Sequence, residues 1–234
     1  MTQIATDSFK AQYGEDKLLW EMFNHRREGF FIEVGAWNGI SLSNTYFLEQ
    51  MGWTGILVEP LRERFEDCVR NRPRSRVVHA ACTGPNQGAT IKFTRVVGNE
   101  MLSCIHAEPA HAQRCRSEGR QFEEIEVPAI TLDRLIMRER NGPWPGPGPW
   151  KPKVGWQIDL VSIDVEGGEM DVLRGFRLDR FKPRVLLIEN NLPSGVAVAE
   201  YLQRFGYKRV HRQVINDFYV RTEFIVQRTP PRTP

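Results

Sequence analysis

The chain has 234 residues, 41% of them hydrophobic and 26% charged, and these ordinary globular values exclude disordered, collagen-like and fibrous proteins. Lys and Arg outnumber Asp and Glu by 32 to 29, and they are scattered along the chain, so no basic stripe predicts a nucleic-acid partner. No apolar run approaches the ~20 residues of a membrane span, and residues 1–16 lack the apolar centre of a signal peptide, so we expect one domain over residues 1–234, in the cytoplasm.

Short apolar runs rich in β-branched residues predict the strands of this domain, and a helical lead-in over residues 1–28 precedes the first of them. Because the runs are almost continuously apolar, they are typical of strands covered by helices on both faces of a mostly parallel sheet. The predicted strands are residues 30–34, 55–58, 76–81, 159–163 and 184–188.

Segments with the helical spacing of apolar residues lie between these strands. They follow the first, second and fourth strands, over residues 42–48, 61–69 and 170–176. Strand and helix therefore alternate along the chain, which predicts a doubly wound α/β fold.

Two regions interrupt this alternation. Residues 89–97 and 125–129 alternate between polar and apolar and predict two additional strands, which flank a long polar connection over residues 98–122. Connections of this length are usually functional or mobile, so this segment is our candidate substrate lid. After a predicted helix over 131–140, the Pro-, Gly- and Trp-rich stretch 142–152 excludes a helix or a ladder strand and predicts a surface loop in the same domain.

The carboxyl-terminal region predicts one helix and two strands. The helix covers residues 196–205 and ends at Gly206, and the strands cover residues 207–210 and 218–226. The short link between the two strands favours an antiparallel pair at one edge of the sheet.

Residues suited to ligand binding begin where the first predicted strand ends, in Glu33-Val-Gly-Ala-Trp-Asn-Gly39. Glycines at 35 and 39 let the backbone turn sharply and approach a ligand, because no Cβ is in the way. A dinucleotide site would have the pattern G-x-G-x-x-G, but residue 37 is Trp, and Glu33 would repel a phosphate. The turn therefore favours a nucleoside with an amine and a sulfonium over one with phosphates.

Acidic residues also end the second and fourth predicted strands. Glu59 lies 24 residues after Gly35, where an acid accepts hydrogen bonds from both ribose hydroxyls. Asp164 and Glu166 end the fourth strand, and they should reach the same crevice because ligands of such sheets bind at the carboxyl ends of the strands. Neither His nor a complete ligand spacing accompanies them, so we expect no metal.

Six motifs follow one another in the chain and together resemble the FkbM-type family of methyltransferases. The resemblance spans residues 9–226. The motifs are Q-Y-G-E-D at 12–16, F-I-E-V-G-A-W-N-G at 31–39, S-N-T at 43–45, L-V-E-P at 57–60, I-T-L-D at 130–133 and S-I-D-V-E-G-G-E at 162–169.

The resemblance implies a class I, Rossmann-like fold with a seven-stranded sheet whose last strand is antiparallel. It also implies S-adenosyl-L-methionine as the cofactor and O-methylation of a sugar, glycan or polyketide-type small molecule. Glu33 is then expected to face the methionine part of the cofactor, Glu59 the ribose, and Ala81 with Cys82 the adenine edge. The other candidate cofactor-binding residues are Tyr13, Gly35, Ala36, Asn38, Gly39, Asn44 and Asp164.

Methylation of a hydroxyl requires a base within hydrogen-bond reach. Our candidates are Asp164 and Glu166, with His106 in the candidate lid as the second choice. A nicotinamide-dependent oxidoreductase is disfavoured by the missing glycine. A nucleic-acid methyltransferase of the same fold and a non-catalytic nucleoside-binding module are the alternatives, since a fold does not fix an activity. The resemblance also leaves room for a homodimer.

Overall fold

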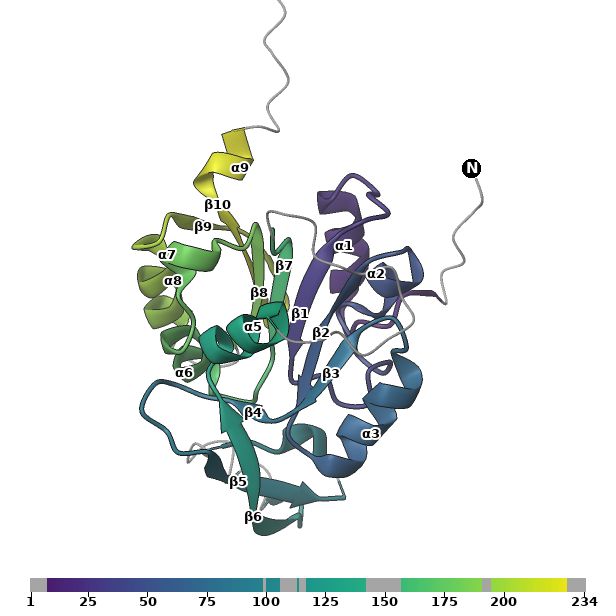
Figure 1. The fold of residues 1–234 in the computed structure, drawn as a ribbon, viewed down its shortest axis with the longest axis vertical. Helices are drawn as coiled ribbons and strands as arrows, with labels where there is room; N and C mark the ends of the chain where they lie inside the picture. The colour runs from purple at the N-terminus through teal and green to yellow at the C-terminus, as the bar shows by residue number, and fades with distance from the viewer. Residues whose placement is uncertain are drawn as a thin grey trace, which may run out of the picture.

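The computed structural model describes residues 8–98, 100–105, 113, 117–141, 157–190 and 195–226. Seven of its strands are β1 (Phe30–Val34), β2 (Thr54–Glu59), β3 (Arg76–His79), β7 (Leu160–Ile163), β8 (Val185–Glu189), β9 (Tyr207–Gln213) and β10 (Asn216–Arg221). They form one sheet in the order β3-β2-β1-β7-β8-β10-β9 (Figure 1). β10 runs antiparallel to the other six strands of this sheet, so the predicted doubly wound fold with an antiparallel last strand is confirmed.

The order of the strands fixes the place where a ligand can enter. From β1 the chain winds outward through β2 to β3, and it then returns to β7 on the other side of β1. The loops after β1 and β7 therefore leave the sheet in opposite directions and open a crevice at the carboxyl ends of these two strands.

Helices cover both faces of the sheet. The described helices are α1 (Glu15–Met22), α2 (Tyr46–Gln50), α3 (Arg62–Asn71), α5 (Leu132–Asn141), α6 (Glu169–Arg174), α7 (Leu178–Phe181), α8 (Gly195–Gln203), α9 (Thr222–Val226) and the short 3-10 helix η2 (Glu100–Leu102). None of the helices within the described ranges is long and apolar enough to cross a membrane.

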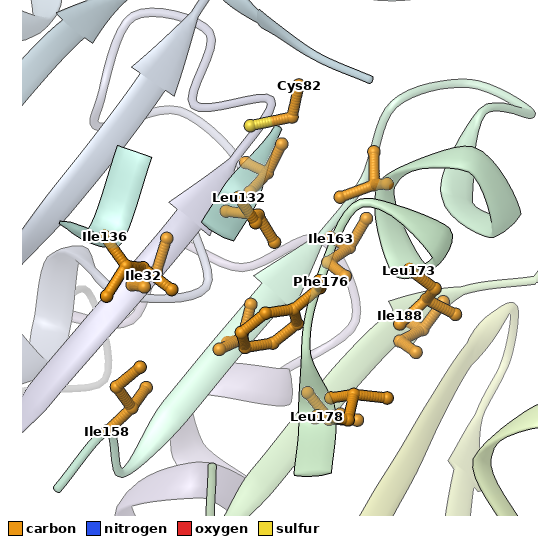
Figure 2. Packing of buried hydrophobic residues seen from close by; sticks show 14 of the residues in the cluster. Ile32, Cys82, Leu132, Ile136, Ile158, Ile163, Leu173, Phe176, Leu178 and Ile188 are labelled. Atoms are coloured by element: carbon orange, nitrogen blue, oxygen red, sulfur yellow. The ribbon is translucent and has the colours of Figure 1, made fainter. Parts of the chain in front are cut away.

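Successive side chains of each strand enter two separate cores, because they point to opposite faces of the sheet. In β1, Phe31 packs with buried residues of α1, α2 and α3, whereas Ile32 packs with α5, α6, α7 and α8. Figure 2 shows the second core, where Phe176 and Leu173 lie against Ile163 and Ile188 of the sheet. Burial on both faces explains why the strands are continuously apolar.

A second, smaller sheet lies beyond the carboxyl ends of the main strands (Figure 1). It consists of β4 (Ala81–Cys82), β5 (Thr90–Val97) and β6 (Gln121–Ile130), in the order β4-β6-β5. The two additional strands predicted from alternation are thus confirmed. Cys104 pairs with Thr94 of β5 through two backbone hydrogen bonds of 2.8 and 3.0 Å, so part of the candidate lid lies along the edge of this sheet.

Several predicted strand boundaries are wrong. β6 begins at Gln121, so the last two residues of the candidate lid belong to it, and β9 continues to Gln213. Residues 76–81 were predicted as one strand, but Ala80 separates β3 in the large sheet from β4 in the small one. Residues 222–226 were predicted to continue the last strand, but they form α9. The strand ends because Arg221 pairs with Tyr207, the first residue of β9, and the next residue, Thr222, instead donates its backbone N–H to the carbonyl of Gly206.

Other predicted segments are described only in part. Of the predicted helical lead-in, α1 and the residues from 8 onward are described. In the candidate lid, residues 99, 106–112 and 114–116 lie outside the described residues, and so does the whole loop 142–152.

Candidate functional site

A cavity of about 1110 Å³, counting the space at its open mouth, lies at the carboxyl ends of β1, β2, β7 and β8. Nine of the predicted site residues line it, and they come from four of the predicted strand ends and the loops that follow them. These residues are Glu33, Gly35, Ala36, Asn44, Glu59, Ala81, Cys82, Asp164 and Glu166.

Four predicted residues are not among those that line the cavity. Asn38 shapes the turn after β1, because its Oδ1 accepts hydrogen bonds from the backbone N–H groups of Ile40 and Ser41. Gly39 has a φ of +78°, and a Cβ there would lie 2.9 Å from the side chain of Arg72. Tyr13 lies between the lining residues Gln12 and Glu15, and His106 lies outside the described residues.

Gly35 marks the closest approach between β1 and the loop after β7. Its φ is +83°, and a Cβ on this residue would lie 1.8 Å from the backbone oxygen of Asp164. The backbone N–H groups of Gly35 and Ala36 both donate to the carbonyl of Val58 at the end of β2. The ends of the three strands are therefore held together by a turn that only glycine can make without displacing Asp164.

Glu33 is the centre of a buried hydrogen-bond network below the cavity. Its carboxylate accepts hydrogen bonds from the Ser43 hydroxyl, the Asn44 backbone N–H and the Thr45 hydroxyl, the last at 2.6 Å. Arg72 lies 3.3 Å from the same carboxylate. Glu33 therefore lines the cavity and also fixes the segment that leads into α2.

Glu59 ends β2 and is only 4% exposed. Its two carboxyl oxygens each accept one backbone N–H, from Trp37 and from Leu61, both at 2.9 Å. Burial raises the pKa of Glu59 to about 8, although the two backbone hydrogen bonds act in the opposite direction. Each oxygen keeps a free lone pair, which is what the hydroxyls of a ribose would need.

Asp164, Glu166 and Glu189 bring their carboxyl groups together at the ends of β7 and β8. One oxygen from each lies within 4.8 Å of the others. Asp164 and Glu189 are hydrogen-bonded to each other, which two carboxyl groups can do only by sharing a proton. Burial, together with neighbouring negative charge, raises the pKa of both groups. Carboxylate oxygens are also the kind of ligand that divalent cations such as Mg²⁺ and Ca²⁺ bind.

Sequence reasoning missed several lining residues. Glu189 directly follows the predicted strand 184–188, so the strand-end rule that selected Asp164 would have found it. Glu15 and Asn216 line another wall and are joined by a 2.7 Å hydrogen bond between side chains 201 residues apart. No pattern of neighbouring residues in the sequence predicts the contact between Glu15 and Asn216.

The charge of the cavity is strongly one-sided. Six carboxyl groups line it, and within the described part of the chain no Lys, Arg or His does so. The six are Glu15, Glu33, Glu59, Asp164, Glu166 and Glu189. Such a cavity attracts cations and repels phosphates. The end of the cavity at Ala81 and Cys82 is apolar, because Leu61, Phe93 and Ile105 line it there.

A family model described as the methyltransferase FkbM domain matches residues 33–143 and 154–209 of the chain. The matched region contains the ends of β1, β2, β7 and β8 and thus most of the cavity. No curated protein matches the chain.

Three solved structures with a similar course of the chain are distant from it in sequence. A TehB-like SAM-dependent methyltransferase from Corynebacterium glutamicum is 11% identical, with a TM-score of 0.42 over 89% of this chain and 85% of that one. A precorrin-6y C5,15-methyltransferase from Geobacter metallireducens is 11% identical, with a TM-score of 0.43 over 93% and 91%. TrmK of M. capricolum, solved with S-adenosyl-homocysteine, is 9% identical, with a TM-score of 0.42 over 93% and 67%.

Proposed function

Because this chain belongs to the family of FkbM methyltransferases, which use S-adenosylmethionine, we propose that it methylates a hydroxyl of a sugar, glycan or polyketide-type small molecule. The observation that carries the proposal is the cavity itself. It combines a glycine turn at the point where the sheet reverses its winding with six carboxyl groups.

The residues of the cavity fit the cofactor in shape and charge. Gly35 has no Cβ, so the backbone of Asp164 can pack directly against the turn, and this contact brings the ends of β1 and β7 together at the cavity. The carboxyl groups suit the ammonium and sulfonium of the cofactor. Glu59 can accept the ribose hydroxyls, and the apolar end at Phe93 can hold the adenine.

The acidic groups at the ends of β7 and β8 support a role in proton transfer. When bound, S-adenosylmethionine supplies a methyl group on a positively charged sulfur. The chain itself has to hold the acceptor hydroxyl in line with that methyl group, and such alignment is worth up to ~7–11 kcal/mol. Asp164, whose carboxyl group is hydrogen-bonded to that of Glu189, is our candidate to receive the hydroxyl proton.

A nucleic-acid substrate is less compatible with the site. Phosphates are bound by Lys and Arg, and the described lining of the cavity offers only carboxyl groups as charged side chains. This supports an uncharged small-molecule acceptor.

The test has two stages. Isothermal titration of the purified chain with S-adenosylhomocysteine should give saturable binding, and failure to bind would overturn the proposal. S-adenosylmethionine with a labelled methyl group is then incubated with hydroxylated sugars, glycans and polyketide alcohols, with tRNA and DNA oligonucleotides as parallel arms. Label transferred to a hydroxyl compound supports the proposal, and label found only in nucleic acid contradicts it.

A further inference from the structure

Arg72, the residue that follows α3, is fully buried and lies outside the cavity. We propose that it is a positioning residue that holds the segment from Gly39 to Thr45 in its ligand-binding shape. The proposal rests on the proposed function, because that segment borders the place expected for the amino-acid part of the cofactor.

The guanidinium of Arg72 binds the segment at both ends. Its Nη1 donates to the carbonyl of Gly39 at 3.0 Å, and its Nη2 donates to the hydroxyl of Thr45 at 2.9 Å. On its third side, Nε donates to the carboxylate of Glu49 in α2 at 2.9 Å. A planar group with donors on three sides can make these bonds at once, whereas the single ammonium of a lysine cannot match their geometry.

Glu33 completes the attachment from the sheet. It accepts hydrogen bonds from Ser43, Asn44 and Thr45, and Arg72 contacts the same carboxylate. Glu33 and Arg72 therefore hold the same seven residues together. The side chain of Asn44 also donates to the Ser162 hydroxyl of β7, at 3.1 Å.

The held segment forms one wall of the cavity, although neither Arg72 nor Thr45 reaches it. Ser41, Leu42, Ser43 and Asn44 all line the cavity. Arg72 can thus influence a ligand only indirectly, through this wall and through the carboxylate of Glu33. The residues at the other end of the cavity, Glu59 and Ala81 to Cys82, make no hydrogen bond to Arg72 among those described.

The charges in this network explain why a cation is needed at this position. Glu33 and Glu49 are both buried and lie on two sides of Arg72. Without the cation, two carboxylates would face each other in a dry interior, and removing one partner of such a buried pair leaves an uncompensated charge. The wall would then lose the fixed carboxylate of Glu33, which is the acceptor that orders Ser43 to Thr45.

The placement predicts a selective loss of affinity. S-adenosylhomocysteine spans the whole cavity in the proposed function, whereas adenosine occupies only the end at Glu59 and Cys82. Arg72→Lys should raise the Kd of S-adenosylhomocysteine about tenfold or more, and Thr45→Val about fivefold, since each deletes hydrogen bonds that shape the wall. The Kd of adenosine should stay within about twofold of the wild-type value, because its end of the cavity is not attached to Arg72.

Isothermal titration with both compounds tests this, with Arg70→Lys as the matched control because Arg70 lies in the last turn of α3, two residues before Arg72, and is exposed. Circular dichroism establishes that each variant is folded, and Thr45→Val, which keeps the shape of the side chain, decides the matter if Arg72→Lys does not fold. Equal losses for both compounds, or no loss for either, would overturn the positioning role. A wild-type chain that binds neither compound would instead overturn the proposed function, and this proposal with it.

Discussion

Glu59 combines two tasks at one carboxyl group. It holds the turn after β1 through Trp37 and the start of α3 through Leu61, and in the proposed function it also accepts the ribose hydroxyls. Glu59→Ala should therefore raise the Kd of S-adenosylhomocysteine about tenfold or more, because two hydrogen bonds to the ribose and the attachment of the turn are lost together. Isothermal titration measures the effect, with the exposed Glu66→Ala as control. An unchanged Kd would remove Glu59 from the cofactor site.

Asp164 and Glu189 should behave as one proton-sharing unit. Asp164→Asn should keep the affinity for S-adenosylhomocysteine and lower turnover by a factor of about 10²–10⁴, the usual contribution of a general base. Glu189→Gln preserves the shape of the side chain and should lower turnover as well, since the pair can no longer share a proton. Initial rates with an acceptor from the screen measure both, and full turnover in Asp164→Asn would exclude it as the base.

At the level of single elements, the turn after β1 depends on a close approach between two strand ends. Gly35 and Gly98 have nearly the same φ, +83° and +80°, but a Cβ at Gly98 would meet nothing within 4 Å. Gly98→Ala should cost about 1 kcal/mol of unfolding free energy, from the backbone conformation alone. Gly35→Ala should cost at least about 3 kcal/mol, because the backbone of Asp164 must also move. Urea denaturation compares the two, and equal losses would contradict the role of the approach.

The elements that carry the site were predictable because they obey a local rule. Strands buried on both faces are continuously apolar, so β1, β2, β7 and β8 stand out in the sequence, and the acidic residue at each end stands out with them. The end of β10 could not be predicted this way. Residues 218–220 and 224–226 are apolar and flank the polar residues 221–223. This pattern fits one interrupted strand as well as a strand followed by a helix, and pairing stops at Arg221 because β9 begins at its partner Tyr207.

The network around Arg72 was not predictable either. Its side chain contacts residues 23 to 39 positions away in the sequence, and these contacts exist only after β1, α2 and α3 have packed together. Arginine usually indicates a solvated surface, so the residue type alone points to the wrong environment for Arg72, which is fully buried. The motif at 43–45 was visible in the resemblance, but its partners were not.

For the whole molecule, net charge and local charge have opposite signs. The chain carries a formal charge of +3, yet six carboxyl groups line its main cavity. Burial raises the pKa values of Glu59, Asp164 and Glu189, and repulsion by neighbouring acids of the cavity raises those of Asp164 and Glu189 further. Part of the stability of the ligand-free fold therefore depends on pH.

The sign of this dependence follows for Glu59, whose pKa rises from 4.5 to about 8 on folding. The folded chain holds a proton that the unfolded chain has released, so the stabilising contribution is present below pH 4.5 and is lost as the pH rises toward 8. Glu59→Gln has no charged form at this position. The unfolding free energy of the wild type minus that of Glu59→Gln should therefore decrease as the pH rises toward about 8. Urea denaturation across this range measures it, and a constant difference would contradict the assignment.

The hydrogen bond between Glu15 and Asn216 fixes a residue near the start of the described chain in one wall of the cavity. A second bond, from the Gln213 side chain to the carbonyl of Tyr13, fastens the same stretch to the β9–β10 hairpin. A shortened protein that begins just before β1 would still contain all seven strands of the large sheet. It would nevertheless lack the wall of the cavity that contains Glu15. The residues before β1 are therefore part of the site, and deleting them should impair ligand binding.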